Sequence, residues 1–241
     1  MRGLRPGDRA DAVVSHYHWI DSLKNSDLGH ALTSPHEQCI VQFQAKNDVT
    51  YTVNASSAGK AEREGESTLW LHDSDNTLLA SLTFCVARSH GRPVLVIGGL
   101  QGPRRNVSRE AIKQATRACH GLFPKRVLME VIFQLAAQAN IHAIFAVSDE
   151  GHVFRALRYR LSKGRHFHAS YDEFWETLSG RKLSPFCWQL PLQVERKSLE
   201  EIASKKRAEY RRRFELLDDI AGSMSSRFQT TEGFRQLRTR I

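Results

Sequence analysis

Hydrophobic residues recur at helical spacing in several segments of this chain. An apolar residue at every third or fourth position forms one continuous face of an α-helix. Asp11 and Ser108 can accept hydrogen bonds from the first turn of a helix, and Pro124 suits its first position. The spacing predicts helices over 10–23, 108–119, 125–139 and 198–220, and a short helix over the aromatic and acidic segment 171–178.

A different pattern predicts strands. Alternating or continuous short runs of apolar, β-branched residues are typical of strands, and the turn sequence Asp73-Ser-Asp-Asn joins two of them into a β-hairpin. The apolar run 92–97 is typical of a strand buried on both faces. The polar stretch 55–67 is expected to be a loop. The predicted strands are 39–44, 50–53, 70–72, 78–87, 92–97, 141–147 and 188–192.

The order of these elements predicts an α/β (α+β) fold. Strand 92–97, two helices and strand 141–147 form a crossover unit, which pairs its strands in parallel and is right-handed. The hairpins add antiparallel strands, so we expect a central mixed sheet with crossover helices and a basic helix at the C-terminus. A chain of 241 residues suits one domain, which we place at 1–221, with a disordered tail over 222–241.

Composition narrows the class of protein. With 41% hydrophobic and 25% charged residues, the chain matches ordinary globular domains, and it contains no apolar run long enough to cross a bilayer. No apolar segment of a secretory signal follows Met1. The four cysteines show no Cys-x-x-Cys spacing and are expected to be reduced. We therefore expect a cytoplasmic protein that is not an integral membrane protein.

The net charge of +9 favours anionic partners. Much of the excess lies in 88–105, 155–165 and 197–213. The last segment has two interpretations. Its Lys and Arg residues suit a nucleic acid or an anionic lipid surface, whereas the interleaved acids, such as Glu200 and Glu209, favour a solvated face of salt bridges.

A glycine-rich segment follows the apolar strand 92–97. Glycines after a core strand can expose backbone N–H groups to a phosphate or another anionic small molecule, and cations lie nearby. The pattern is neither a Walker loop nor the dinucleotide fingerprint, and a tight turn that needs positive φ is the simpler interpretation. The candidate anion-binding residues are Gly98, Gly99, Gln101, Gly102, Arg104, Arg105, Lys125 and Arg126.

Three polar residues follow the second core strand. Ser148, Asp149 and His152 can supply acid–base or orienting groups beside the glycine segment, or they can cap the next helix. Histidine pairs at 16/18 and 166/168 lack obvious carboxylate or thiolate partners, so no metal site is expected. Cys119 and His120 would point about 100° apart on a helix. His120 is therefore badly placed to activate Cys119 as a thiol nucleophile.

Several ordered motifs resemble the VirK/YbjX family of bacterial proteins. The resemblance implies a domain of unknown function, associated with virulence, antimicrobial-peptide resistance and the DNA-damage response, with no catalytic residue to carry over. Family members usually have a longer N-terminal region before the His16-Tyr17 segment. The motifs are Ile97-Gly-Gly-Leu-Gln-Gly-Pro, Ala115-Thr-Arg-Ala-Cys-His-Gly-Leu-Phe-Pro-Lys-Arg, Val147-Ser-Asp, His152-Val, Arg158-Tyr-Arg, Tyr171-Asp-Glu-Phe-Trp and Lys205-Lys-Arg-Ala-Glu-Tyr-Arg-Arg-Arg.

The order of elements is also similar to the acetyltransferase-like fold that binds acyl-CoA. That likeness implies a cofactor pyrophosphate at the strand-to-helix turn, although the helix over 108–119 interrupts this join and the usual glycine spacing is missing. Two hypotheses follow. One is an acyl- or aminoacyl-transferase-like enzyme with an acyl-CoA donor. The other is a non-catalytic stress or virulence factor that binds an acidic partner through its basic surface.

Overall fold

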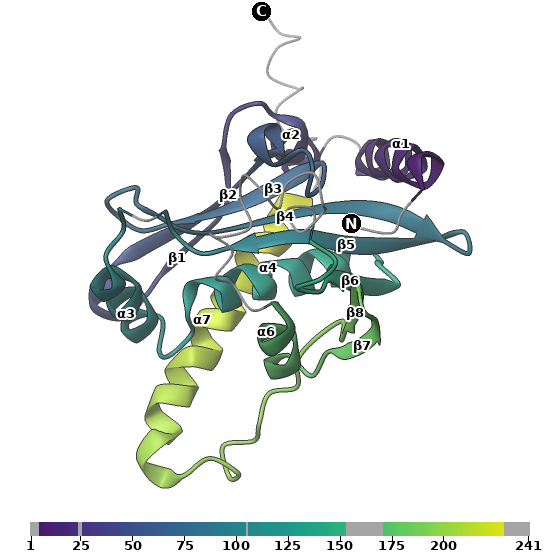
Figure 1. The fold of residues 1–241 in the computed structure, drawn as a ribbon. Helices are drawn as coiled ribbons and strands as arrows, with labels where there is room; N and C mark the ends of the chain where they lie inside the picture. Colours follow the sequence, from purple (N-terminus) through teal and green to yellow (C-terminus); the bar gives the residue numbers. More distant parts are fainter. Residues whose placement is uncertain (1–4, 24–25, 105, 153–170, 229–241) are drawn as a thin grey trace, which may run out of the picture.

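A computed structural model describes residues 5–23, 26–104, 106–152 and 171–228 (Figure 1). In these residues the strands form one eight-stranded sheet in the order β1-β2-β3-β4-β5-β6-β8-β7, which confirms the mixed α/β class. The strands are β1 Gln38–Gln44, β2 Thr50–Ser57, β3 Ser67–His72, β4 Leu78–Ser89, β5 Arg92–Gln101, β6 Ala143–Val147, β7 Arg181–Ser184 and β8 Cys187–Leu190. The helices are α1 Pro6–Ser22, α2 Asp27–Thr33, α3 Arg109–Ala118, α4 Pro124–Gln138, α6 Tyr171–Thr177 and α7 Ser204–Phe228, with single 3-10 turns at Lys46–Asp48 and Gly59–Ala61.

Among the described strands, one neighbouring pair is parallel and the others are antiparallel. Strands β1 to β5 form an antiparallel meander, β5 and β6 pair in parallel over Val94–Ile97 and Ala143–Ala146, and β8 and β7 return antiparallel. The predicted hairpin and the predicted crossover are both confirmed. Because β5 and β6 are parallel, their carboxyl ends meet at the same edge of the sheet.

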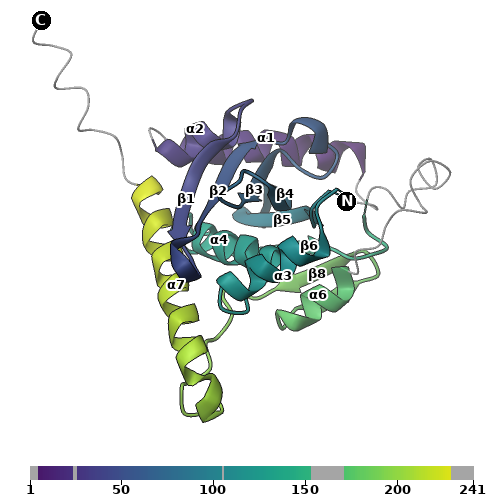
Figure 2. The same ribbon diagram turned by 90° about the vertical axis from the view of Figure 1, so that its left-hand side faces the viewer.

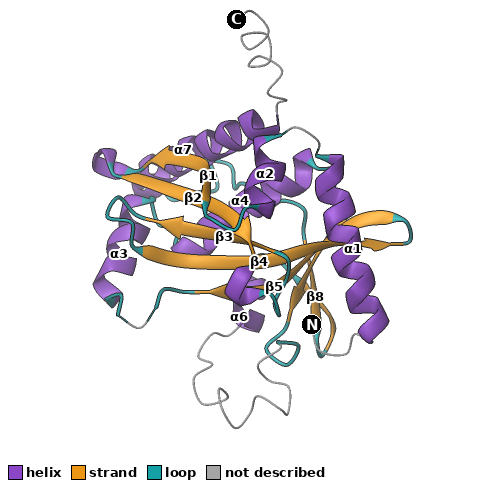
Figure 3. Cartoon of the chain, turned by 90° about the horizontal axis from the view of Figure 1, so that it is seen from above, coloured by secondary structure: helices purple, strands orange, loops and turns teal. Residues whose placement is uncertain are grey.

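Helices cover both faces of the sheet. Helices α1 and α2 lie on one face, and α4, α6 and α7 lie on the other (Figures 1 and 3). The apolar side of α4 explains its place, since Val127, Leu128, Val131 and Leu135 are all fully buried. Among the described residues, no helix combines the length and the hydropathy that a membrane crossing requires.

The C-terminal helix α7 runs beside the edge strand β1 (Figure 2). The Ser223 hydroxyl accepts a hydrogen bond from the backbone N–H of Gln42 at 3.4 Å, and Met224 is fully buried. A helix over an edge strand blocks pairing with another chain. The prediction of a disordered tail from residue 222 is wrong as far as Phe228, because Met224 anchors the helix there. Residues 229–241 of that tail lie outside the described residues.

Two short elements were not expected from the sequence. Helix α2 begins after Ser26, whose hydroxyl accepts from the Gly29 N–H at 3.1 Å. Strand β7 carries only exposed or half-buried side chains, so it lacks the apolar pattern of a strand. Helix α7 begins at Ser204, six residues later than predicted from the sequence.

Candidate functional site

The glycines that follow Ile97 form a strand and not a turn. Gly98 and Gly99 belong to β5, and neither has a positive φ. The register shifts here, because Thr83 pairs with Gly99 whereas Phe84 pairs with Ile97. Gly98 is therefore the extra residue of a β-bulge, a device that proteins often place beside active sites. The prediction of a glycine turn is wrong at this point.

The close approach of Glu64 explains why glycine occupies both positions. A Cβ atom on Gly98 would lie 1.7 Å from the main-chain oxygen of Glu64, and one on Gly99 would lie 1.8 Å from its Oε2 atom. Glu64 belongs to the segment between β2 and β3, whose Glu66 N–H donates to the main-chain oxygen of Phe84 in β4 at 3.0 Å. The glycines thus admit a carboxylate to the interior, at the carboxyl end of β5.

The carboxylate of Glu64 faces a buried histidine. His152 Nε2 lies 3.2 Å from Glu64 Oε1, and the two side chains are 0% and 3% exposed. Gln101 Nε2 donates to both carboxylate oxygens, at 2.9 Å and 3.2 Å. Acidic side chains are almost never fully buried unless they are paired, and here the carboxyl group of Glu64 faces an imidazole. We call Glu64, Gln101, His152 and Tyr171 the Glu64–His152 centre.

Tyr171, at the start of α6, packs against His152 in this centre. Its ring stacks on His152 with 5.4 Å between ring centroids, and its hydroxyl oxygen accepts the backbone N–H of Leu100 at 3.1 Å. Burial and the negative charge of Glu64 raise the pKa of Tyr171 well above its usual value. The phenol therefore stays protonated at neutral pH.

Ser148 and Asp149 hold the segment that carries His152. The Ser148 hydroxyl donates to the main-chain oxygen of Pro185 at 2.5 Å and accepts from the Gly151 N–H at 2.9 Å. Asp149 Oδ1 accepts from the Tyr171 N–H at 2.8 Å, which caps the start of α6. Of the three predicted residues, His152 alone contacts Glu64, and the other two position the segment around it.

Only part of the predicted cation set lies at this end of the sheet. Lys125 Cε lies 4.0 Å from the position of a Cβ on Gly102, and burial lowers the pKa of Lys125 while Asp149 opposes that shift. Gln101 and Gly102 are exposed, Lys125 and Asp149 are half-buried, and Glu64 and His152 are buried. Exposed and half-buried residues therefore lie beside a buried acid–base pair at this end of the sheet.

The other cations point elsewhere. Arg126 pairs with Glu130 at 2.5 Å on the same helix, and Arg104 is exposed in a hollow that it shares with His72. Arg105 lies outside the described residues, as do His166 and His168. Among the residues that the structure describes, no group of three or more His, Cys, Asp and Glu side chains is arranged to hold a metal ion.

Sequence reasoning missed Glu64 because it lies in the polar stretch 55–67, which resembles an ordinary loop. The adjacent glycines Gly98 and Gly99 were the available signal, since paired glycines in a strand often mark a close approach of another segment. The local sequence pattern could not show that the approaching residue is Glu64, which lies 34 residues before Gly98 in the chain.

Fold and site together define a class: a mixed α/β domain with a buried carboxylate–imidazole pair at the carboxyl ends of two parallel strands. The family described as "Protein of unknown function (DUF535)" matches residues 1–226, and the chain belongs to this family.

Three relatives were found. The chain is 38% identical to "Uncharacterized protein YbjX" of Escherichia coli K12 over 91% of this chain and 66% of that protein. Two proteins of Haemophilus influenzae Rd, each described as "Uncharacterized protein", are 41% and 32% identical over 53% and 64% of this chain, and over 42% and 48% of their own lengths. The matches confirm the resemblance to YbjX, and the chain spans about two fifths to two thirds of the length of these relatives.

Proposed function

We propose that this chain transfers an acyl or aminoacyl group from an acyl-CoA donor to a hydroxyl or amine acceptor. The observation that carries the proposal is the buried contact of 3.2 Å between His152 Nε2 and Glu64 Oε1. A carboxylate beside an imidazole stabilises the imidazolium that forms when the imidazole accepts a proton. Such a pair suits a reaction in which an acceptor must lose a proton as it attacks a carbonyl carbon.

The position of the pair supports this class of reaction. In α/β sheets, ligands bind outside the carboxyl ends of parallel strands, and the only parallel pair among the described strands, β5 and β6, ends here. The order of hairpin, core strand, helix α4 and parallel strand is similar to that of the acetyltransferase-like fold that binds acyl-CoA. The helical insertion α3 remains a departure from that order.

The roles follow from the contacts. The acceptor attacks the thioester carbonyl and its proton passes to His152. The C–S bond then breaks, and His152 returns the proton to the departing CoA thiolate, which leaves as the thiol. Glu64 stabilises the imidazolium, and Gln101 holds the carboxylate in place through two hydrogen bonds. Lys125, half-buried beside the exposed Gly102, is placed to meet an anionic group of the donor.

Titration calorimetry with coenzyme A, acetyl-CoA and a longer acyl-CoA tests the proposal. We expect binding in the micromolar range, weakened by Lys125→Gln and unchanged by Lys113→Gln, an exposed lysine of α3. Absence of binding of every donor at millimolar concentration would rule out the donor class. Equal weakening by both variants would show that net charge alone attracts the donor.

A second candidate function rests on the first half of α7. This half extends away from the sheet (Figures 1 and 2), and its exposed cations outnumber its acids. Glu209 reaches Arg213 at 3.8 Å, but no carboxylate of the described residues lies within 4.0 Å of Lys205, Lys206, Arg211 or Arg212. The expected face of salt bridges is therefore largely unformed here, which favours an anionic polymer or lipid surface as partner.

A salt series tests the second candidate. We expect DNA or anionic vesicles to bind at low salt and to be released as salt rises, because contacts with phosphates displace counterions. Binding that is absent at low salt, or indifferent to salt, would count against it. The association with virulence, peptide resistance and the DNA-damage response, and the cytoplasmic location, remain predictions.

A further inference from the structure

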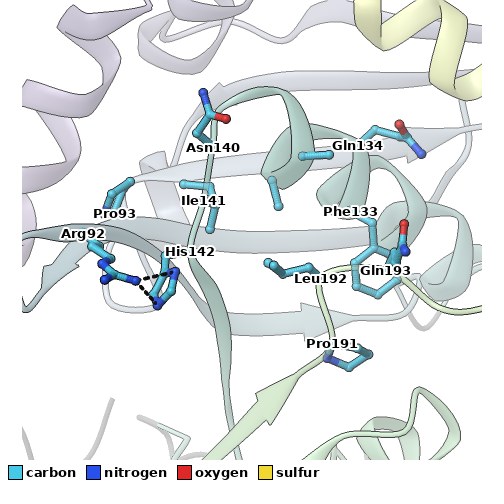
Figure 4. Close-up of a pocket in the computed structure, with 12 residues that line it drawn as sticks. Arg92, Pro93, Phe133, Gln134, Asn140, Ile141, His142, Pro191, Leu192 and Gln193 are labelled. Carbon is cyan, nitrogen blue, oxygen red and sulfur yellow. Dashed lines mark hydrogen bonds between the residues drawn. The ribbon is translucent and has the colours of Figure 1, made fainter.

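A cavity lies at the end of the parallel strands opposite the Glu64–His152 centre. Its volume is about 800 Å³, and it opens where β5 and β6 begin and where α4 ends (Figure 4). Ligand pockets commonly have volumes of about 300–1,000 Å³. Strand β5 has ten residues, so roughly 30 Å separates this cavity from Gln101 at the other end of the strand. The cavity is therefore separate from the Glu64–His152 centre and does not depend on the proposed function.

The cavity has an apolar wall. Pro93 and Pro191 are half-buried and contribute apolar surface, and Leu192 projects between the buried side chains of Ile141 and Phe133 (Figure 4). Leu192 is 43% exposed, although its neighbour Leu190 is buried. Apolar surface that stays in contact with water is a source of binding energy for an apolar ligand, at about 25 cal/mol for each Å² covered.

One side of the cavity is basic. Arg92 Nη1 lies 3.2 Å from Nε2 and 3.5 Å from Nδ1 of His142, and both side chains are exposed (Figure 4). In the part of the chain that the structure describes, no carboxylate lies within 4.0 Å of Arg92 or His142. The guanidinium has five N–H donors and matches the geometry of a carboxylate. The positive charge at this rim therefore lacks a counterion from the described protein.

We propose that the cavity binds a single-chain fatty carboxylate. The alkyl chain lies along Leu192, Pro93 and Pro191. The carboxylate meets Arg92 and His142 at the rim. Charge complementarity selects an anionic head, and the apolar wall selects a hydrocarbon tail. An alkyl phosphate has the same overall polarity, but the planar fork of one arginine favours a planar carboxylate.

Titration of the purified chain with dodecanoate, dodecanol and dodecyl phosphate tests this site. We expect dodecanoate to bind about tenfold more tightly than dodecanol, and Arg92→Gln to abolish that preference while dodecanol binding is kept. Leu192→Ser should weaken both ligands. Arg181→Gln, an exposed arginine of β7, is the matched control and should change neither.

Three results would overturn the proposal. The first is no saturable binding of dodecanoate below its micelle concentration. The second is equal loss of affinity in Arg92→Gln and Arg181→Gln, which would indicate general charge attraction. The third is tighter binding of dodecyl phosphate than of dodecanoate. Circular dichroism of each variant establishes that the fold is intact, and both substituted arginines are exposed, so unfolding is not expected.

Discussion

The buried side chain of His16 makes the stability of the fold depend on pH. His16 is fully buried in α1, its Nδ1 atom accepts the Val86 N–H at 3.0 Å, and its Nε2 atom lies 3.0 Å from the Ser67 hydroxyl. Since Nδ1 accepts, the proton of the neutral ring resides on Nε2 and is donated to Ser67. Burial lowers the pKa of His16 to about 4 from its usual value of 6.5.

The two pKa values of His16, in the unfolded and the folded chain, determine whether stability rises or falls with pH. An unfolded chain takes up a proton on this histidine near pH 6.5, whereas the folded chain resists protonation until about pH 4. The stabilising contribution is therefore present in full above pH 6.5 and is lost as the pH falls towards 4. The full difference corresponds to roughly 3 kcal/mol, of which about 2 kcal/mol is lost between pH 7 and pH 5.

Urea unfolding followed by tryptophan fluorescence measures this loss. His16→Gln should be less stable than the wild type at pH 7, because one amide replaces two ring contacts. It should also lose about 2 kcal/mol less on going from pH 7 to pH 5. His30→Gln, at an exposed position of α2, should keep the wild-type dependence. If His16→Gln loses as much stability as the wild type over this interval, His16 is not held neutral and the argument fails.

Three further predictions concern packing, capping and thiol chemistry. Gly98→Ala should lower the free energy of unfolding by about 1–3 kcal/mol, because its Cβ collides with the main chain of Glu64; an unchanged urea midpoint would contradict this contact. Ser108→Ala removes the cap of α3 and should cost about 1 kcal/mol in the same assay, and no loss would mean that the cap is not formed. Burial raises the pKa of Cys119 to about 12, so iodoacetamide at pH 8 should leave it unmodified while the exposed Cys39 reacts; alkylation of native Cys119, detected by mass spectrometry, would show that it is accessible.

Local pattern was sufficient for most of the sheet. The hairpin of β3 and β4, the buried strand β5 and the crossover to β6 all follow from turn residues and short apolar runs, which depend only on neighbours in sequence. The same applies to Ser108, which caps α3 as predicted, with 3.1 Å between its hydroxyl and the Ala111 N–H. The charged strand β7 and the C-terminal end of α7 were not predicted, because both form through packing against other segments of the chain.

The candidate site shows the limit of sequence reasoning more sharply. His152 and Lys125 were named from their place after core elements, and both lie at the carboxyl end of the parallel strands. Glu64 was missed and Gly98 was assigned to a turn for the same reason. The two segments that carry them are far apart in sequence but meet in space, and a local pattern does not reveal such a contact. Position relative to a strand was predictable, whereas the identity of the group that packs against it was not.

Acceptor-dependent release of the CoA thiol tests the central claim most directly. The assay compares the wild type with Glu64→Gln and His152→Asn, and with Glu66→Gln as a matched control two residues along the same segment. Glu66 is half-buried and contacts Tyr17 at 3.4 Å, away from His152.

We expect turnover by the wild type and by Glu66→Gln, with a fall of at least about 100-fold in the two variants of the centre, the usual loss when an acid–base group is removed. Circular dichroism and donor binding should be unchanged in all three variants. Turnover by Glu64→Gln at the wild-type rate, or a wild type that binds donors but releases no thiol with any hydroxyl or amine acceptor, would contradict the account.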